Sequence, residues 1–302
     1  MRNLTTRTKK FLHIGTTLAL GMALFLSGPV WAADDTEPEP PANDKDHVPP
    51  IVFQAAGPTA ESIQSSVDAF RAALGEPNNG NAPGPLDNGR REINWDGGGG
   101  VDVTTEPVTP FDVFLDTRGG QFITPGTGLS QAPPSGGPQD GLAGLFNNQT
   151  YGTIFSTFSP LRLFTPVDSN ITKALFFVPG TEGKDAATVR GFGAVFTDID
   201  QPDGSGSDQK KEEEEEKDDH EASTLIEYFS TDDKLLFSSF VPASPGDGSL
   251  SFFGIVFDEA RIAWVRITSG NVAPGPDDDK KNDIVVMDDF IYGEPQPLPY
   301  NR

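Results

Sequence analysis

Two adjacent carboxylates, Asp288 and Asp289, interrupt an apolar stretch near the end of the chain, which reads "NDIVVMDDFIYGEP" over residues 282–295. The flanking residues predict a buried strand, and an unpaired carboxylate inside a protein is costly. Because successive side chains of a strand point to opposite faces, we expect one aspartate to lie outward or at the sheet rim while the other meets a partner. Candidate partners are backbone N–H groups at the strand end and the guanidinium groups of Arg90, Arg91 and Arg266.

Several catalytic chemistries lack their central residue. The chain contains no cysteine, which excludes disulfides and thiolate metal sites. Its three histidines, His13, His47 and His220, fall in the N-terminal segments and in an acidic loop, outside the predicted ordered domain. A Ser-His-Asp triad, a His-ligated zinc and a histidine base are therefore excluded there. Carboxylate pairs of the glycosidase kind stay open, but the candidate acids have the context of solvated surface groups: Glu92, Glu227, Glu259 and Glu294. We predict no catalytic residue.

The charge of the chain restricts its partners. Asp and Glu number 45 against 22 Lys and Arg, which gives a formal net charge of −23. Such a charge repels phosphate backbones, so we expect no nucleic-acid partner. Anionic membrane surfaces are disfavoured for the same reason, whereas divalent cations and neutral polymers fit.

An all-β scaffold must position these residues. The composition, with 33 Gly, 27 Pro and 22 Phe, is typical of short strands joined by tight turns. Short connections between half-buried strands imply antiparallel neighbours, and this many strands close most naturally as two packed sheets. We predict a jelly-roll-like antiparallel β-sandwich over residues 91–294, with a long surface loop at 125–150. Candidate strands are 91–95, 111–115, 120–124, 151–158, 161–165, 173–178, 188–197, 223–230, 234–241, 249–257, 261–268 and 283–292.

Residues 51–90 are predicted to form one amphipathic helix and a turn-rich connector that pack on this sandwich. Thr59 can cap the helix and Gly75 ends it. Four apolar residues fall at i, i+4, i+7 and i+11 and form a single stripe: Ile63, Val67, Phe70 and Leu74.

The remaining segments are predicted to lie outside the folded core. A basic start, an apolar run and "VWA-AD" indicate a signal peptide at 1–32, so we expect a secreted or periplasmic protein with no membrane span after cleavage. An acidic, Pro-rich leader follows at 33–50. The acidic insertion 201–222 is predicted to be a disordered loop, and 295–302 a tail.

The later strands carry a resemblance to a known group. The "GFG" strand in "ATVRGFGAVFTDID", the hairpin "STDDKLL", the "FFG" strand and the closing "VVMDDFIYG" resemble a pattern of secreted bacterial proteins, many with a PEP-CTERM sorting signal and a link to extracellular polysaccharide. The resemblance covers about residues 186–293. The C-terminal "GEPQPLPYNR" departs from it, because it lacks the Pro-Glu-Pro motif, so we do not expect anchorage by that signal.

The closing strand is also similar to that of jelly-roll carbohydrate-binding modules, in which a carboxylate of the last strand often helps to hold a structural calcium. This likeness implies that Asp288 or Asp289, with Asp96 of "INWDGG" and backbone carbonyls, supplies part of a calcium shell. Such a shell needs about six to eight oxygens. Pairing with arginine or with backbone N–H groups stays open as the alternative.

Two functions follow from the resemblance. The first is a non-catalytic extracellular protein that binds polysaccharide or forms part of a surface matrix; the second is a glycosidase or lyase on a jelly-roll scaffold. A glycan-binding face needs two or three exposed, coplanar aromatic rings, and each candidate could equally belong to the core. The candidates for ligand stacking are Trp264, Tyr228, Trp95 and Tyr292.

Overall fold

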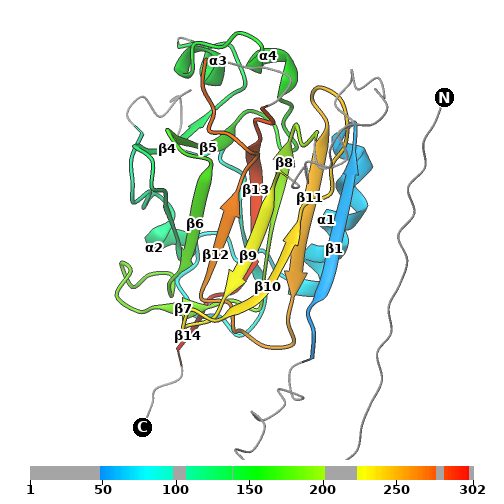
Figure 1. The fold of residues 1–302 in the computed structure, drawn as a ribbon. Coiled ribbons are helices and arrows are strands. Elements are labelled where there is room, and N and C mark those ends of the chain that lie inside the picture. Colours follow the sequence, from blue (N-terminus) through cyan, green and yellow to red (C-terminus); the bar gives the residue numbers. More distant parts are fainter. Residues whose placement is uncertain (1–47, 98–106, 138, 201–222, 277–281, 299–302) are drawn as a thin grey trace, which may run out of the picture. The chain divides into compact units, whose positions relative to one another are not determined.

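The computed structural model describes residues 48–97, 107–137, 139–200, 223–276 and 282–298 (Figure 1). Within these ranges most of the regular structure is β, and every ladder between the named strands is antiparallel, which confirms the predicted all-β class. The predicted signal peptide, the leader up to residue 47 and the acidic insertion lie outside the described residues.

Seven strands form the larger sheet. Three of its strands, β8, β11 and β13, are buried along their whole length, which places them at the centre, covered on both sides. The strand order along the sheet is β1 (Ile51–Gly57), β11 (Leu250–Val256), β8 (Gly191–Thr197), β13 (Val286–Gly293), β5 (Leu163–Val167) and β4 (Gly128–Ala132), and β2 (Arg90–Ile93) also pairs with β13.

Five strands form the second sheet, and two short strands pair separately. The five follow the order β10 (Leu235–Phe240), β9 (Leu225–Phe229), β12 (Trp264–Thr268), β6 (Ile171–Phe176) and β3 (Gly120–Ile123). Burial alternates along β6 and β12, as expected for strands with one side in a core and the other turned outward, whereas the three middle residues of β9 are all buried. The short pair is β7 (Ala187–Thr188) with β14 (Gln296–Pro297).

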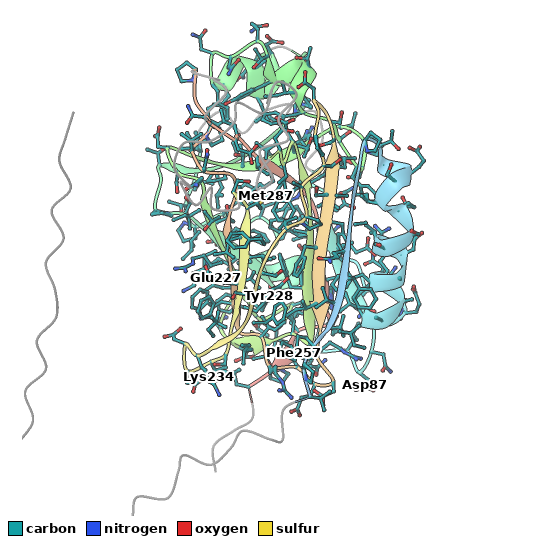
Figure 2. The ribbon with its side chains drawn as sticks, turned by 45° about the vertical axis from the view of Figure 1, so that its right-hand side comes forward. Asp87, Glu227, Tyr228, Lys234, Phe257 and Met287 are labelled. Carbon is teal, nitrogen blue, oxygen red and sulfur yellow. The ribbon has the colours of Figure 1, made fainter. Side chains whose placement is uncertain are left out.

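The two sheets share one apolar core. Phe192 of β8, Phe253 of β11 and Phe290 of β13 belong to the same buried cluster as Ile226 of β9 and Val265 of β12. Since these side chains come from both sheets, the inward sides of the two sheets face each other across this cluster. Figure 2 shows the alternation at β9, where the successive residues Glu227 and Tyr228 lie on opposite sides of the strand.

Helix α1 (Ala60–Leu74) covers the outer face of the seven-stranded sheet. Its buried residues are the four of the apolar stripe, and they pack on Val195, Phe252 and Ile291. Three shorter helices are α2 (Leu115–Arg118), α3 (Gly141–Leu145) and α4 (Tyr151–Ile154). The last two share an apolar cluster with Ala132, Leu163 and Val286 at one end of the strands.

Several predicted boundaries are wrong. Residues 151–158 contain α4 instead of a strand, and 111–115 form a turn that leads into α2. The predicted loop 125–150 contains β4 and α3. The segment 51–90, predicted as a helix and a connector, begins with strand β1 ahead of the helix. These segments carry little periodicity of their own, and pairing with β5 and β11 decides that β4 and β1 are strands.

Candidate functional site

The carboxylates of Asp288 and Asp289 lie together, contrary to the expectation that they point to opposite faces. The register between β13 and β8 shifts between Met287 and Phe290, so the two aspartates occupy a β-bulge. A bulge adds a residue to one strand and breaks the alternation of side chains. Both carboxylates consequently reach the hydroxyl of Ser159, which donates to Asp289 Oδ1 (2.6 Å) and lies 3.3 Å from Asp288 Oδ1.

The carboxylates of Asp288 and Asp289 both have partners within the protein. The backbone N–H of Phe158 donates to Asp288 Oδ2 at 2.6 Å, as one of the sequence-based alternatives predicts. The arginine nearest to the two aspartates is Arg71 of α1, whose Nη2 lies 3.5 Å from Asp289 Oδ2. It is not one of the three arginines that the sequence analysis named as candidate partners. Arg71 also binds Glu92 of β2 through two nitrogens, at 3.2 and 3.0 Å.

Burial controls the charge of this pair. Asp288 is 0 % and Asp289 3 % exposed. Loss of water raises the pKa of the Asp288 carboxyl well above its ordinary value, and the neighbouring Asp289 raises it further. Burial also raises the pKa of Asp289, although the Ser159 hydroxyl and Arg71 oppose this. Burial and the closeness of the two carboxyls therefore raise the free-energy cost of placing two negative charges here.

Asp96 does not join the pair in a metal-binding group. Its Oδ1 accepts the backbone N–H of Arg162 (3.0 Å) and its Oδ2 the side-chain amide of Asn94 (3.1 Å), while burial raises its pKa. Among the described residues, no three His, Cys, Asp or Glu side chains are grouped so that they could hold a metal ion. The structural calcium stays a prediction.

Three of the four aromatic candidates for ligand binding are core residues, and this corrects the sequence analysis. Trp95, Tyr228 and Tyr292 are each 0 % exposed, so no ligand on the surface can stack on them. Their polar atoms donate to backbone carbonyls: Trp95 to Asp288 (2.8 Å), Tyr228 to Phe192 (3.2 Å) and Tyr292 to Arg118 (3.0 Å). Buried tyrosine and tryptophan usually satisfy their donors in this way.

Trp264 differs, because it lies half-buried on the outward side of the five-stranded sheet. We call this side the open face and define it by Phe229, Glu227, Trp264, Arg266, Lys173 and Leu175. In Figure 1, no described helix lies in front of β6, β12 and β9, whereas α1 covers the other sheet. The open face thus presents both polar and apolar side chains.

The indole of Trp264 is held in one orientation. Its ring stacks on Phe229 with the centroids 3.8 Å apart and the planes 6° apart, and its Nε1 donates to Asp233 at 2.9 Å. Lys173 Nζ lies 3.6 Å from the centroid of the same ring. A side chain that is already fixed loses little conformational entropy when a ligand binds.

A row of charges runs beside this aromatic pair. Arg266 lies directly opposite Glu227 on β9 and Lys173 on β6. Its guanidinium binds both carboxylate oxygens of Glu227, with Nη2 at 2.7 Å from Oε1, and its side chain stays 45 % exposed. The other glutamates considered from the sequence are also paired with arginine: Glu92 with Arg71 and Arg90, Glu294 with Arg91, and Glu259 with Arg261.

Lys173 is the charged residue of the open face that the sequence analysis did not single out, and the apolar residues Phe229 and Leu175 were not named there either. Lys173 stands in "ITKALF", where apolar and polar residues do not alternate cleanly, because Ile171 and Leu175 also face outward. Its position as the one cation within an apolar strand was the available signal.

Family models, curated proteins and solved structures offered no match to this chain. The candidate site therefore rests on geometry alone. Within the described residues, no helix has the length and apolar character needed to cross a membrane.

Proposed function

We propose that this chain is an extracytoplasmic, non-catalytic protein that binds polysaccharide on the open face of a jelly-roll-like β-sandwich. The observation that carries the proposal is the Trp264–Phe229 pair, two stacked, half-buried rings fixed on a sheet surface that no described helix covers. The apolar C–H side of a sugar ring packs against such aromatic side chains, and neighbouring polar groups supply hydrogen bonds to its hydroxyls.

The carboxylates of the chain support a non-catalytic role. Glu227, the acid of the open face, is engaged by Arg266 through both oxygens, so both already have a partner. Asp288 and Asp289 lie close together, but they are buried and already bonded to Ser159 and Phe158. A glycosidase needs two carboxylates that reach a sugar from either side.

The test is retention of the protein by a panel of insoluble and gel-embedded polysaccharides. Trp264→Ala should reduce retention by about tenfold or more, because truncation of an aromatic anchor in a binding surface costs roughly 2 kcal/mol. Ile51→Ala is the matched control, since Ile51 is an exposed apolar residue (62 %) on β1 of the other sheet. Thermal unfolding of both variants checks that they fold. If no polysaccharide retains the parent protein, the proposal fails.

A further inference from the structure

The ammonium group of Lys173 lies over the face of the Trp264 ring that Phe229 does not cover. The two residues belong to β6 and β9, which flank β12 on opposite sides. The phenyl ring therefore covers one side of the indole and the ammonium group the other, at 3.8 and 3.6 Å from its centroid. A sugar can stack on Trp264 only after the ammonium group has moved away.

Lys173 is the cation of the open face that has no ion pair of its own among the described residues, although the carboxylate of Asp233 lies beside the same indole. Lys173 stands directly opposite Arg266, and like charges in this position repel each other. Glu227 compensates Arg266, but in the described part of the chain no carboxylate lies within ion-pair distance of Lys173. The direct contact that the described residues give Lys173 is its weak attraction to the indole ring.

From this arrangement we infer that the open face selects polysaccharides made of uronic acids. A neutral sugar that displaces Lys173 from the ring removes the cation–π contact and offers the ammonium group only neutral oxygens, which are weaker acceptors than a carboxylate. A sugar carboxylate replaces that contact with an ion pair, next to Arg266, while the sugar ring takes the free side of the indole. The inference rests on the proposed function and specifies its ligand.

The overall charge of the chain makes local cations necessary for such a ligand. With a net charge of −23, the protein repels a polyanion at long range. At physiological ionic strength this repulsion is screened beyond roughly 8 Å. Contacts at the open face then decide the affinity, and Lys173 and Arg266 are the cations that the face offers.

The experiment compares polygalacturonate with its fully methyl-esterified form, which has the same sugars without the charge. Affinity electrophoresis of the full chain at physiological salt measures both. We expect the acid to bind about tenfold more tightly than the ester, as for a hydrogen bond to a charged group. Lys173→Gln should weaken binding of the acid by about tenfold and leave binding of the ester unchanged or stronger, because the ring is then uncovered.

Lys184→Gln is the matched control, because Lys184 is an exposed lysine (73 % of its side chain) that pairs with Glu182 away from the open face. It should bind both polymers as the parent does. Dextran sulfate tests whether any polyanion suffices; binding as tight as that of polygalacturonate would overturn the selectivity for carboxylates.

The outcomes separate the inference from the proposed function. Equal binding of acid and ester, lost in Trp264→Ala, would overturn the inference and leave the proposed function intact. A preference for the acid that Lys173→Gln does not change would also overturn it, since the selecting charge would lie elsewhere. If neither polymer and no member of the polysaccharide panel binds the protein, both the inference and the proposed function are wrong.

Discussion

Asp288 and Asp289 show how one local irregularity changes the chemistry of a strand. The bulge in β13 brings their carboxylates to one hydroxyl, that of Ser159, in a place almost without water. Two carboxylates that share a site raise each other's cost of ionisation. The charged groups around them, Arg71 and Glu92, oppose each other, so burial is the largest cause of the raised pKa of both carboxyls.

We predict that Asp288 makes the protein less stable as the pH rises. Its pKa is raised in the folded state, so above about pH 4 the unfolded chain loses this proton first. The free energy of unfolding then falls with rising pH until the folded-state pKa is reached. Asp288→Asn keeps the shape of the protonated acid and should reduce this loss between about pH 5 and about pH 7.5 by roughly 1 kcal/mol or more. Urea unfolding of the parent and of Asp288→Asn at both pH values measures this difference in the free energy of unfolding.

Asp87→Asn is the control for that prediction, because Asp87 is an exposed aspartate of the connector (Figure 2). Its unfolding free energy should follow the parent at both pH values. If Asp288→Asn shows the same pH dependence as the parent, the carboxyl of Asp288 is ionised in the folded protein and the argument is wrong.

The docking of α1 depends on two glycines. Gly193 of β8 and Gly254 of β11 are paired in register, and the ring of Phe70 lies over both. A Cβ at either position would meet a ring carbon of Phe70 at 2.9 Å. Phe70 also makes edge contacts with Phe53 and Phe252. The "GFG" and "FFG" strands thus leave a space that one side chain of the helix fills.

Gly254→Ala should destabilise the protein by about 1–3 kcal/mol, because the added methyl group forces Phe70 out of a packed site. Combining it with Phe70→Leu should recover part of this loss, since the smaller side chain makes room. Gly97→Ala is the control, because nothing lies within 4 Å of a Cβ built there. Chemical unfolding decides the matter; an effect of Gly254→Ala no larger than that of Gly97→Ala would contradict this account of the helix contact.

At the scale of the whole molecule, the two sheets differ in what covers their outer faces. α1 closes the seven-stranded sheet through an apolar cluster that includes Val195, Leu250 and Val256. The five-stranded sheet presents half-buried aromatic and charged side chains instead. Large exposed apolar patches are rare on monomers unless they bind something. This contrast directs the search for a ligand to the open face.

Removing β1 and α1 should therefore expose apolar surface on the seven-stranded sheet. A chain that begins at residue 76 lacks β1 and α1, whereas a chain that begins at residue 48 keeps both. The shorter chain should bind a hydrophobic dye more strongly than the longer one and should self-associate. Light scattering and dye fluorescence measure both properties. A shortened chain that stays monomeric and binds no more dye would show that α1 is dispensable for covering the sheet.

Local patterns in the sequence determined the class of the fold and much of what its residues cannot do. The short, Gly-rich alternation predicted antiparallel β structure, and the spacing of Ile63, Val67, Phe70 and Leu74 marked the side of α1 that is buried. The absence of cysteine and the positions of the three histidines restricted the chemistry without any structure. These properties depend on residue type and on periods of a few residues.

The tertiary structure alone decided which side of each strand is covered. The sequence left Tyr228, Tyr292 and Trp264 open as core or ligand-binding residues, and the packing of the two sheets makes Tyr228 and Tyr292 interior and leaves Trp264 half-buried. The bulge at Asp288 likewise arises from the pairing of β13 with β8, whose partner residues lie about 90 positions away. Burial and register depend on contacts between distant segments, and a period of two along one strand does not by itself show which segment will cover each of its faces.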